Sequence, residues 1–357
     1  MKIYLAGTTV SNPEQELVIQ SIFRVGCKLH SYYHCQEGGF ENKWFEVNMK
    51  NKVDLFLDSG AFSAFTQGVN IDIQQYISFI KEHEDVLTVY ANLDVIGDGK
   101  ATWQNQKIME EAGLSPLPVF HLDEWQENGA YYLEKCMEYP YFCIGGIARG
   151  GMRGTRESFL KGCFDIICDT PDRKPRHKVH GFGLTSLKLM LQYPWYSVDS
   201  TSWVVTGRMG SIYVPRFWGG QYLYDKDSWK ITVSARSPGM SDDPDHIDNM
   251  KHKRPRVHQQ ILDYIHSKGY NLGKSSFKKE HQDYQLADNE KWTQKRPENK
   301  TDKRLVEVLE EEGLCNKYQL RDELNIIYFL DLEKSMPEWP WAFEHSGPVK
   351  KGGLGLL

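Results

Sequence analysis

Short apolar runs alternate with amphipathic stretches along the first 203 residues of the chain. The eight runs are residues 2–7, 28–34, 53–60, 86–94, 117–122, 141–148, 177–184 and 195–200. Between them apolar residues recur at helical spacing, as Ile73, Tyr76, Ile77 and Ile80 do. Apolar strands that alternate with helices predict a parallel α/β sheet covered on both faces. Eight such units in about 200 residues favour a (β/α)8 TIM-like barrel. An open doubly wound sheet is the alternative, but its G-x-G-x-x-G fingerprint is missing after the first run.

Two helix starts are indicated by single residues. Pro13 directly follows Asn12, which is a favourable beginning for a helix. The apolar residues within 160–167 share one helical face, and Thr155 is positioned to cap that helix.

The remaining residues, 204–357, predict a C-terminal α+β extension to the barrel of residues 1–203. Residues 210–235 alternate aromatic residues around GG and DKD turns, which predicts a hairpin or a small sheet. Residues 301–313 predict a helix that Gly313 ends, and residues 325–332 predict a strand.

The composition is that of a packed globular chain. Aromatic residues make up 13% and hydrophobic residues 40%. Seven cysteines without regular spacing argue against a disulfide framework and for a reducing compartment. The N-terminal apolar stretch becomes polar too soon for a signal peptide, and no apolar run approaches the ~18 residues of a membrane span. We therefore expect a cytoplasmic protein with no membrane partner.

The net charge of −5 hides a basic segment. Residues 251–304 hold 14 Lys and Arg against 7 Asp and Glu, an excess of +7, so the rest of the chain carries −12. Tyr270, Phe277, Tyr284 and Trp292 interleave with these cations. Cations for phosphates and aromatic rings for unstacked bases are typical of nucleic-acid-binding segments. A solvated linker is the alternative interpretation.

Charged or glycine-rich residues stand at the ends of several predicted strands. Asp58, Asp94, His121 and Asp199 end the third, fourth, fifth and eighth runs, and the sixth and seventh end in GGIARGG and HGFG. Any one of these residues is ordinary in a turn. In a barrel, however, the carboxyl ends of all strands meet at one rim, where the active site lies. We therefore predict a catalytic barrel in which glycines let a ligand approach the backbone.

Motifs exclude several common sites. The chain has no G-x-x-x-x-G-K-[ST] phosphate loop and no G-x-S-x-G nucleophile elbow. Two groups invite a metal interpretation: Cys27, His30, His34 and Cys35, and Cys163, Cys168, His177 and His180. Neither group has the close C-x-x-C pair of a structural zinc site. A continuous strand would separate His34 from Cys35, and Cys163 lies on an apolar helix face. We expect no metal and no cofactor.

Two carboxylates across a pocket are the minimal set for breaking a glycosidic bond with retention. One attacks the anomeric carbon, while the other protonates the departing group and later deprotonates the acceptor. Such retention needs roughly 5–5.5 Å between the two carboxyl groups. The third and eighth predicted strands both end at the rim, so Asp58 and Asp199 are the candidate pair.

Four motifs stand in order on the predicted strands: DSGAF at 58–62, YANLD at 90–94, GGIARGG at 145–151 and VDS at 198–200. The first resembles D-S-G-G-F-Q and the third resembles G-G-L-A-V-G-E of the tRNA-guanine transglycosylase superfamily. The other two stand where that family has a guanine-reading and a nucleophilic aspartate. Within the superfamily, the chain looks most like the DNA-guanine transglycosylases of the DpdA type found in phages and bacteria. The resemblance covers residues 50–203.

The resemblance implies a role for each matching residue. Asp199 would be the nucleophile, Asp58 the general acid/base, and Phe62 the aromatic residue that stacks on the base. Asp94 would read the guanine edge, with His121 near the position of a base-reading Gln. The other implied substrate-binding residues are Ser59, Gly145, Gly146, Ile147, Gly181 and Gly183.

Departures from the family pattern favour DNA and a neutral base. Gly151 replaces the Glu that meets a cationic aminomethyl group in bacterial tRNA enzymes, which favours the neutral 7-cyano-7-deazaguanine (preQ0). Ala61 and Ser63 replace the second Gly and the Gln of the first motif. The C-x-C-x-x-C zinc motif of the tRNA enzymes is absent, since only Cys315 follows residue 168.

We therefore expect a glycosyltransferase that exchanges guanine in DNA for a 7-deazaguanine, after flipping the base out of the stack. The alternatives are the same reaction on tRNA, a hydrolase that releases the base to water, and a catalytically silent nucleic-acid-binding paralogue. The presence of both Asp58 and Asp199 argues against the silent paralogue. The cations expected to contact the polymer are Arg149, Arg208, Arg216, Lys251, Lys253, Arg254 and Arg256.

Overall fold

This computed structural model describes residues 1–8, 13–50, 53–147, 153–184, 186–236, 243–293 and 303–344. The chain divides into two compact units. The first comprises Met1–Thr8, Glu16–Thr201 and Glu333–Leu357, and the second comprises Thr9–Gln15 and Ser202–Leu332. The boundary after Thr201 lies close to the expected one, while residues from Glu333 onward belong to the first unit.

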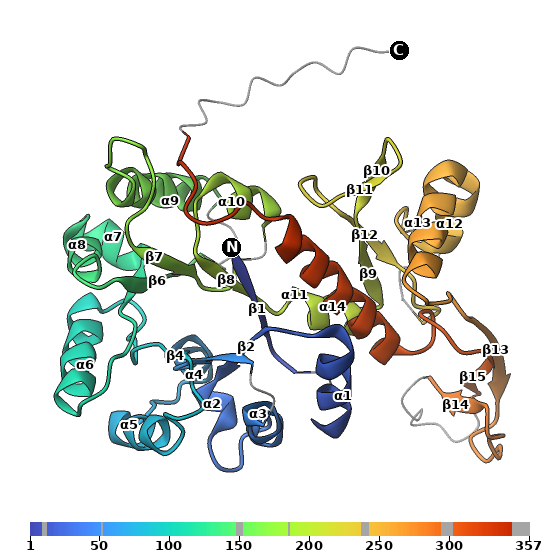
Figure 1. Ribbon diagram of the computed structural model, residues 1–357. Coiled ribbons are helices and arrows are strands. Elements are labelled where there is room, and N and C mark those ends of the chain that lie inside the picture. The colour runs from blue at the N-terminus through green and yellow to red at the C-terminus, as the bar shows by residue number, and fades with distance from the viewer. Residues whose placement is uncertain are drawn as a thin grey trace. The chain divides into compact units, whose positions relative to one another are not determined.

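The first unit is built on one sheet of eight parallel strands (Figure 1). The strands are β1 (Lys2–Ala6), β2 (Cys27–Ser31), β3 (Asp54–Asp58), β4 (Val89–Tyr90), β5 (Val119–His121), β6 (Tyr141–Gly145), β7 (Lys178–Gly181) and β8 (Ser197–Ser200). Each overlaps one of the eight apolar runs, so the predicted strands are confirmed. Their order is β4-β3-β2-β1-β8-β7-β6-β5, and a parallel bridge joins Ala91, just after β4, to Leu117, just before β5. This α/β arrangement is compatible with a TIM-like (β/α)8 fold.

Helices lie along the outer side of the curled sheet, as Figure 1 shows for α5 to α9. The helices that follow these strands are α1 (Pro13–Phe23), α2 (Tyr32–Cys35), α3 (Asn42–Met49), α4 (Ala61–Gln67), α5 (Ile73–Glu82), α6 (Gly99–Glu111), α7 (Leu122–Asn128), α8 (Tyr131–Cys136), α9 (Arg153–Ile167) and α10 (Leu187–Gln192). The predicted start at Pro13 is confirmed. The predicted cap at Thr155 was wrong, because α9 begins at Arg153 and its polar first turn has no apolar periodicity from which to read its start.

The helix α5 shows how local sequence sets these elements. Asp72 precedes it and accepts hydrogen bonds from the backbone N–H groups of Gln74 (2.8 Å) and Gln75 (3.0 Å), which are free at a helix start. Tyr76 and Ile77, whose spacing predicted the helix, are buried on its inner face.

Alternate residues of a strand belong to different apolar layers. This alternation determines on which side of the sheet the last side chain of a strand lies. Leu55 and Leu57 of β3 pack against residues of α5, whereas Phe56 packs in a second cluster with Tyr4. Successive side chains point to opposite faces of a strand. Asp58, two residues after Phe56, therefore lies on the side of the second cluster and not on the helix-covered side.

In the described residues, the second unit contains three small antiparallel sheets. β9 (Ser211–Val214) pairs with β12 (Trp229–Thr232), and β10 (Arg216–Trp218) pairs with β11 (Gln221–Leu223) across a turn of two glycines with positive φ. These pairs confirm the small sheets predicted in residues 210–235. The third sheet consists of β13 (Lys274–Glu280), β14 (Glu290–Trp292) and the central β15 (Arg304–Glu311). The helices are α11 (Ser202–Arg208), α12 (Ile247–Lys253), α13 (Pro255–Ser267) and α14 (Tyr318–Ser335).

Two predicted elements of the tail were wrong. The helix predicted over residues 301–313 is replaced by β15, because β13 and β14 pair with its two edges and outweigh the helical preference of Leu and Glu. The strand predicted over residues 325–332 lies within α14. A short apolar run does not distinguish a strand from a buried helix, and α14 buries both polar and apolar residues, among them Asn325 and Phe329.

Candidate active site

A cavity of about 190 Å³ lies at the carboxyl ends of the parallel strands. It is lined by Leu29, Asp58, Ala61, Phe62, Asp94, Ile96, His121, Asp123, Gly145, Gly146, Phe182, Gly183 and Asp199. The structure thus brings together most of the predicted catalytic and substrate-binding residues. The lining residues that were not predicted are Leu29, Ala61, Ile96, Asp123 and Phe182.

Two of the unpredicted residues stand beside predicted ones along the chain. Asp123 follows the end of β5 at His121, and Phe182 lies between Gly181 and Gly183 at the end of β7. Asp123 directly follows the fifth predicted strand, and Phe182 lies within the HGFG end of the seventh, so each is marked in the sequence only by its position at a strand end.

Asp58 ends β3 close to two other carboxylates. Burial, followed by the charges of Asp94 and Asp199, raises the pKa of Asp58 to about 8. A hydrogen bond from the backbone N–H of Gly60 to Oδ2 (3.1 Å) opposes this shift. A carboxyl group with a pKa of about 8 keeps its proton at neutral pH. Asp58 is therefore equipped to act as an acid.

Asp94 lies beyond the end of β4, and two side chains hold its carboxylate. Ser59 Oγ donates a hydrogen bond to Oδ1 (2.8 Å), and His121 Nε2 lies 3.0 Å from Oδ2. These contacts fix the orientation of the carboxylate. Because each carboxylate oxygen has two acceptor positions, Asp94 can still accept hydrogen bonds from a ligand.

His121 ends β5 between two carboxylates. Its Nε2 faces Asp94, and its Nδ1 lies 3.3 Å from Glu124 Oε1. Burial alone would lower the pKa of His121, but the hydrogen bonds and charges of Asp94 and Glu124 outweigh it and raise the pKa to about 10. Glu124 also accepts the backbone N–H of His121 (3.1 Å), which ties the ring to the start of α7. Both ring N–H groups are thus engaged, so His121 positions Asp94 and offers the cavity its ring surface.

Asp199 lies in β8 at the end of a chain of buried polar groups. The backbone N–H of Gly183 donates a hydrogen bond to Asp199 Oδ1 (2.7 Å), and His180 Nε2 lies 3.4 Å from the same oxygen. His180 Nδ1 lies 2.7 Å from Ser197 Oγ, which lies 2.6 Å from Tyr141 Oη. Burial lowers the pKa of His180, although Asp199 opposes the shift, so the ring is neutral. If Ser197 donates its hydroxyl proton to Nδ1, the proton of the neutral ring lies on Nε2, which faces Asp199.

Three predicted substrate-binding residues do not line the cavity. Ser59 is fully buried, and its hydroxyl acts on the cavity through Asp94. Ile147 is buried as well. Gly181 faces Trp195, and a Cβ at this position would lie 3.0 Å from the indole ring. The missing side chain at Gly181 therefore serves core packing and not the approach of a ligand.

Two glycines, Gly145 at the cavity and Gly60 near Asp58, have neighbours that leave no room for a side chain. A Cβ on Gly145 would lie 2.5 Å from His121 Cδ2, so this glycine makes room for the imidazolium. Gly60 has φ = 78°, a left-handed conformation, and a Cβ there would meet Tyr33 Cβ at 2.5 Å. These positions fit glycine alone, because a side chain would displace His121 at the first and Ser31 and Tyr33 at the second.

The helix α4 places one aromatic ring, that of Phe62, at the cavity. Phe62 lines the cavity although its side chain is 53% exposed. Phe65, on the next turn of the same helix, is 60% exposed. Exposed aromatic faces beside a cavity are suited to stacking on a planar base.

One group among the described residues has the geometry to hold a metal ion, namely His30, Cys35 and Glu41. β2 ends at Ser31 and α2 follows, so the expectation of a continuous strand through residue 34 was wrong. His30 Nδ1 lies 3.1 Å from Glu41 Oε2, and His30 Nε2 lies 3.0 Å from Asn48 Nδ2. Burial raises the pKa of the Cys35 thiol and disfavours the thiolate that a metal needs. The group is satisfied as a buried polar network, and the absence of a metal stays a prediction.

The predicted polymer-binding cations of the second unit differ in their contacts. Lys251 and Lys253 are exposed on α12, and Arg256 is exposed on α13. Arg254, between these helices, forms an ion pair with Asp245 (2.6 Å). The three exposed cations are the better candidates for contact with phosphates.

The other predicted cations are placed differently. Arg216 Nε donates a hydrogen bond to the backbone carbonyl of Asp227 (2.7 Å), and its guanidinium lies 4.4 Å from the centre of the Trp229 ring. Arg208 is exposed in the last turn of α11. Arg149 lies outside the described residues.

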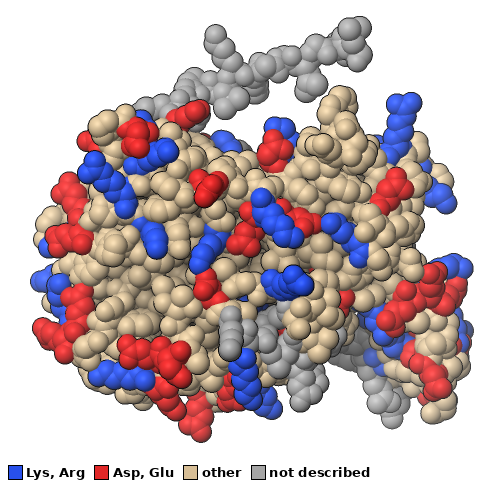
Figure 2. All heavy atoms as spheres, in the orientation of Figure 1, with Lys and Arg blue, Asp and Glu red and all other residues tan. Residues whose placement is uncertain are grey.

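Ion pairs neutralise part of the basic segment. The pairs in the three-stranded sheet include Lys274–Glu310, Lys278–Glu290 and Lys291–Glu307. Figure 2 shows acidic and basic side chains interspersed over the face of the molecule that it draws. The sequence excess of +7 therefore overstates the positive charge that a polymer would meet.

Comparison with known proteins assigns no family. No protein-family model matches the chain, and no curated protein matches it. In the part of the chain that the structure describes, no helix is both long and apolar enough to cross a membrane.

Proposed function

We propose that this protein is a DNA-guanine transglycosylase that exchanges guanine in DNA for a 7-deazaguanine, preQ0, through a covalent glycosyl–Asp199 intermediate. The observation that carries the proposal is the raised pKa of Asp58, about 8, in a cavity that Asp199 also lines. A proton donor and a separate carboxylate in one cavity are the pair that retaining glycosyl transfer requires. The motif resemblance described above supports guanine as the base.

In the first half of the proposed reaction, a guanine flipped out of DNA enters the cavity and stacks on Phe62. An Asp199 oxygen attacks C1′ of the deoxyribose while the bond from C1′ to N9 of guanine breaks. Asp58 gives its proton to the departing guanine and becomes a carboxylate. The hydrogen bond from Gly183 N–H to Asp199 Oδ1 orients the attacking group.

In the second half, guanine leaves and the 7-deazaguanine takes its place. The Asp58 carboxylate removes the proton from N9 of the incoming base, and N9 attacks C1′ as the bond from C1′ to Asp199 breaks. Asp58 thereby regains its proton and Asp199 its charge, so the protein returns to its starting state. No step requires an oxidant, a reductant or a cofactor.

Recognition of the base is proposed for Asp94. A carboxylate only accepts hydrogen bonds, which suits the N1–H and exocyclic amine of guanine and of preQ0 and rejects adenine. His121 and Ser59 hold Asp94 in place for this contact. Gly151 favours a neutral base, but the lining residue Asp123 supplies a carboxylate that a cationic base could contact. The cationic 7-aminomethyl base is therefore the necessary comparison in any assay.

We place the reaction in the cytoplasm, which is the host's cytoplasm if the protein is phage-encoded. All seven cysteines are free and buried, which suits a reducing compartment. The proposed partners are DNA, guanine and preQ0.

The test is to incubate the protein with labelled guanine and either DNA or tRNA, and to measure which polymer becomes labelled. Label in DNA that unlabelled preQ0 chases out, and that the aminomethyl base chases less well, supports the proposal. Label in tRNA would transfer the function to tRNA. Release of guanine from DNA without incorporation would identify a hydrolase, and no label or release with either polymer would contradict base exchange. Asp169→Asn, which changes an exposed carboxylate outside the cavity, is the matched control for variants of Asp199.

A further inference from the structure

A second cavity, of about 290 Å³, lies within the second unit and differs in charge from the first. Four of its lining residues are cationic: Arg236, Lys291, Lys317 and Arg321. None of the described residues that line it carries a carboxylate. The cavity is thus suited to an anion.

Nearby carboxylates offset only part of this charge. Glu307 is fully buried, and it pairs with Arg236 Nε and lies 3.7 Å from Lys291 Nζ. Glu312 pairs with Lys317 at 3.1 Å. Within the described part of the chain, the ion pairs of these four cations involve two carboxylates, which leaves an excess of two positive charges.

A third carboxyl group, that of Asp322, follows Arg321 in the chain without neutralising it. Burial raises the pKa of Asp322 to about 8, although the charges of Arg208 and Arg321 oppose the shift. Asp322 is therefore protonated at neutral pH, and the positive excess remains.

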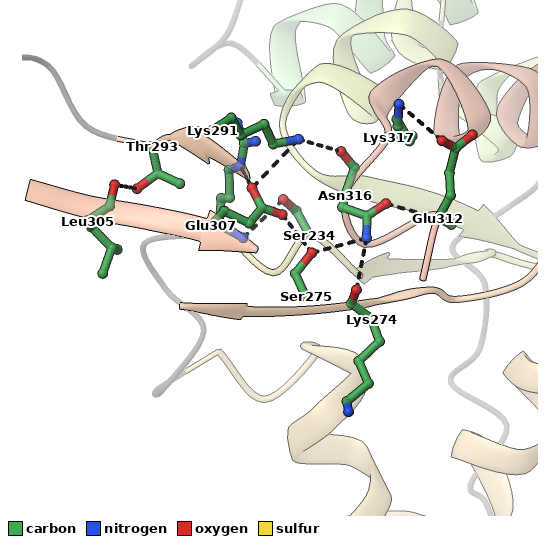
Figure 3. Close-up of polar contacts among 12 residues, drawn as sticks. Ser234, Lys274, Ser275, Lys291, Thr293, Leu305, Glu307, Glu312, Asn316 and Lys317 are labelled. Carbon is green, nitrogen blue, oxygen red and sulfur yellow. Dashed lines mark hydrogen bonds and ion pairs between the residues drawn. The ribbon is translucent and has the colours of Figure 1, made fainter. Parts of the chain in front are cut away.

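Donor groups remain for a ligand. Arg236 uses Nε for Glu307, and its two Nη groups make no hydrogen bond within the described part of the chain. Lys291 Nζ makes one long hydrogen bond, to the carbonyl oxygen of Asn316 (3.4 Å). Figure 3 shows Lys291 and Lys317 on either side of Asn316. Both lysines line the same cavity.

A hydrogen-bonded framework holds these cations. Asn316 Nδ2 donates a hydrogen bond to Ser275 Oγ (3.0 Å), as Figure 3 shows. It also donates to the carbonyl oxygen of Glu311 (2.8 Å), and Asn316 Oδ1 accepts the N–H of Gly313 (3.0 Å). Ser275 Oγ in turn donates to Glu307 (2.7 Å). The same polar network thus holds the lining residue Asn316 and Glu307, the counterion of Arg236. The site is therefore preorganised for a ligand.

The start of α14 also favours the binding of an anion in this cavity. The helix has 18 residues, and its first two, Tyr318 and Gln319, line the cavity. The first backbone N–H groups of a helix have no partner within the helix and carry a partial positive charge. A helix start of this kind, beside four cationic side chains, favours an anion with several acceptor oxygens.

We propose that this cavity binds a phosphate group, carried by a nucleic-acid strand or by a nucleotide. A phosphate monoester has about −1.5 to −2 charges at neutral pH, which matches the excess of two, and its oxygens suit the Arg and Lys donors. The proposal goes beyond base exchange and does not depend on it, because binding is measured without preQ0 or guanine.

The first experiment titrates the whole protein with inorganic phosphate by calorimetry at low ionic strength. The variants are Lys291→Gln, Lys317→Gln and their combination, and the matched control is Lys226→Gln, an exposed lysine of the same unit outside the cavity. Each cavity substitution is expected to weaken phosphate binding about tenfold and the double variant about a hundredfold. Unchanged melting temperatures would show that the variants remain folded.

The second experiment identifies the source of the phosphate with short DNA strands that carry either a 5′-phosphate or a 5′-hydroxyl group. Tighter binding of the phosphorylated strand, lost in the double variant, supports a terminal phosphate. Equal binding of both strands, weakened in the double variant, supports a backbone phosphate. Weakened binding of phosphate and dGMP, with strand binding unchanged, supports a free nucleotide. If the wild type binds no phosphate, or the double variant binds it as tightly as Lys226→Gln, the proposal is overturned.

Discussion

Four aspartates and a histidine line the cavity of the first unit, whereas two arginines and two lysines line the cavity of the second. In the first, like charges crowd together under burial, and the crowding is relieved when one of them takes up a proton: the pKa of Asp58 rises to about 8. In the second, arginine cannot release its proton at neutral pH, so the excess charge remains and is available to an anion.

The comparison teaches that the same physical problem, too much charge of one sign, has two outcomes. A crowded carboxyl group becomes a proton donor and is suited to chemistry. A crowded set of guanidinium and ammonium groups keeps its charge and is suited to binding. The predictions below test whether the first cavity reacts while charged surfaces of the second unit bind.

The largest effect is expected for Asp199→Asn. An amide cannot form the glycosyl ester, so base exchange should fall by at least about 10⁴-fold. Single-turnover exchange of labelled guanine measures the rate, and DNA binding should remain close to that of the wild type. Near-normal exchange would remove Asp199 from the proposed mechanism, provided that Asp169→Asn behaves as the wild type.

Asp58→Asn should slow exchange by roughly 10²–10⁴-fold, because the proton donor is lost. In the wild type, the acid form of Asp58 prevails below its pKa of about 8, so formation of the covalent intermediate should decline as the pH rises through about 8. The variant should lack this decline. A wild-type rate that is flat or rising between pH 7 and pH 9 would contradict the assignment of Asp58 as the acid.

Asp94→Ala should raise the KM for guanine about 10²-fold, because a charged acceptor of two hydrogen bonds is removed. The substitution also removes one of the negative charges that raise the pKa of Asp58, so the decline in rate should move to lower pH. Asp169→Ala is the control. An unchanged KM would exclude Asp94 as the base-reading residue, whereas an unchanged pH profile would mean that Asp94 does not hold the proton on Asp58.

The smallest effect is expected for the exposed cations of α12 and α13. Replacing Lys251, Lys253, Arg254 and Arg256 with Gln should weaken DNA binding and flatten its salt dependence, by about 0.9 in the log–log slope for each lost phosphate contact. Arg254 should contribute least, because it is paired with Asp245. Affinity for free guanine should not change. Binding of duplex DNA and tRNA at several salt concentrations measures this, and an unchanged slope for both polymers would exclude the surface.

Much of the candidate site was determined by the sequence alone, because strand ends are local patterns. An apolar run of strand length followed by a polar residue marks a carboxyl end wherever it occurs, and Asp58, His121 and Asp199 were placed in this way. The alternation along β3 also determines that Asp58 lies on the same side as Phe56. The glycine pair at residues 219–220 likewise marked its hairpin turn through a purely local conformation.

The conformation of β15 and the protonation of the site residues were decided by groups that are distant along the chain. β15 is a strand because β13 and β14 supply hydrogen bonds to both its edges, although its own residues favour a helix. The proton on Asp58 depends on charges that come from the ends of other strands, and the charge on His121 depends on Asp94. Electrostatic energies of this kind vary with the distance between groups and with their burial. Only the folded chain sets these distances, so the sequence alone determined where the chemistry lies, and the tertiary structure decided which group holds the proton.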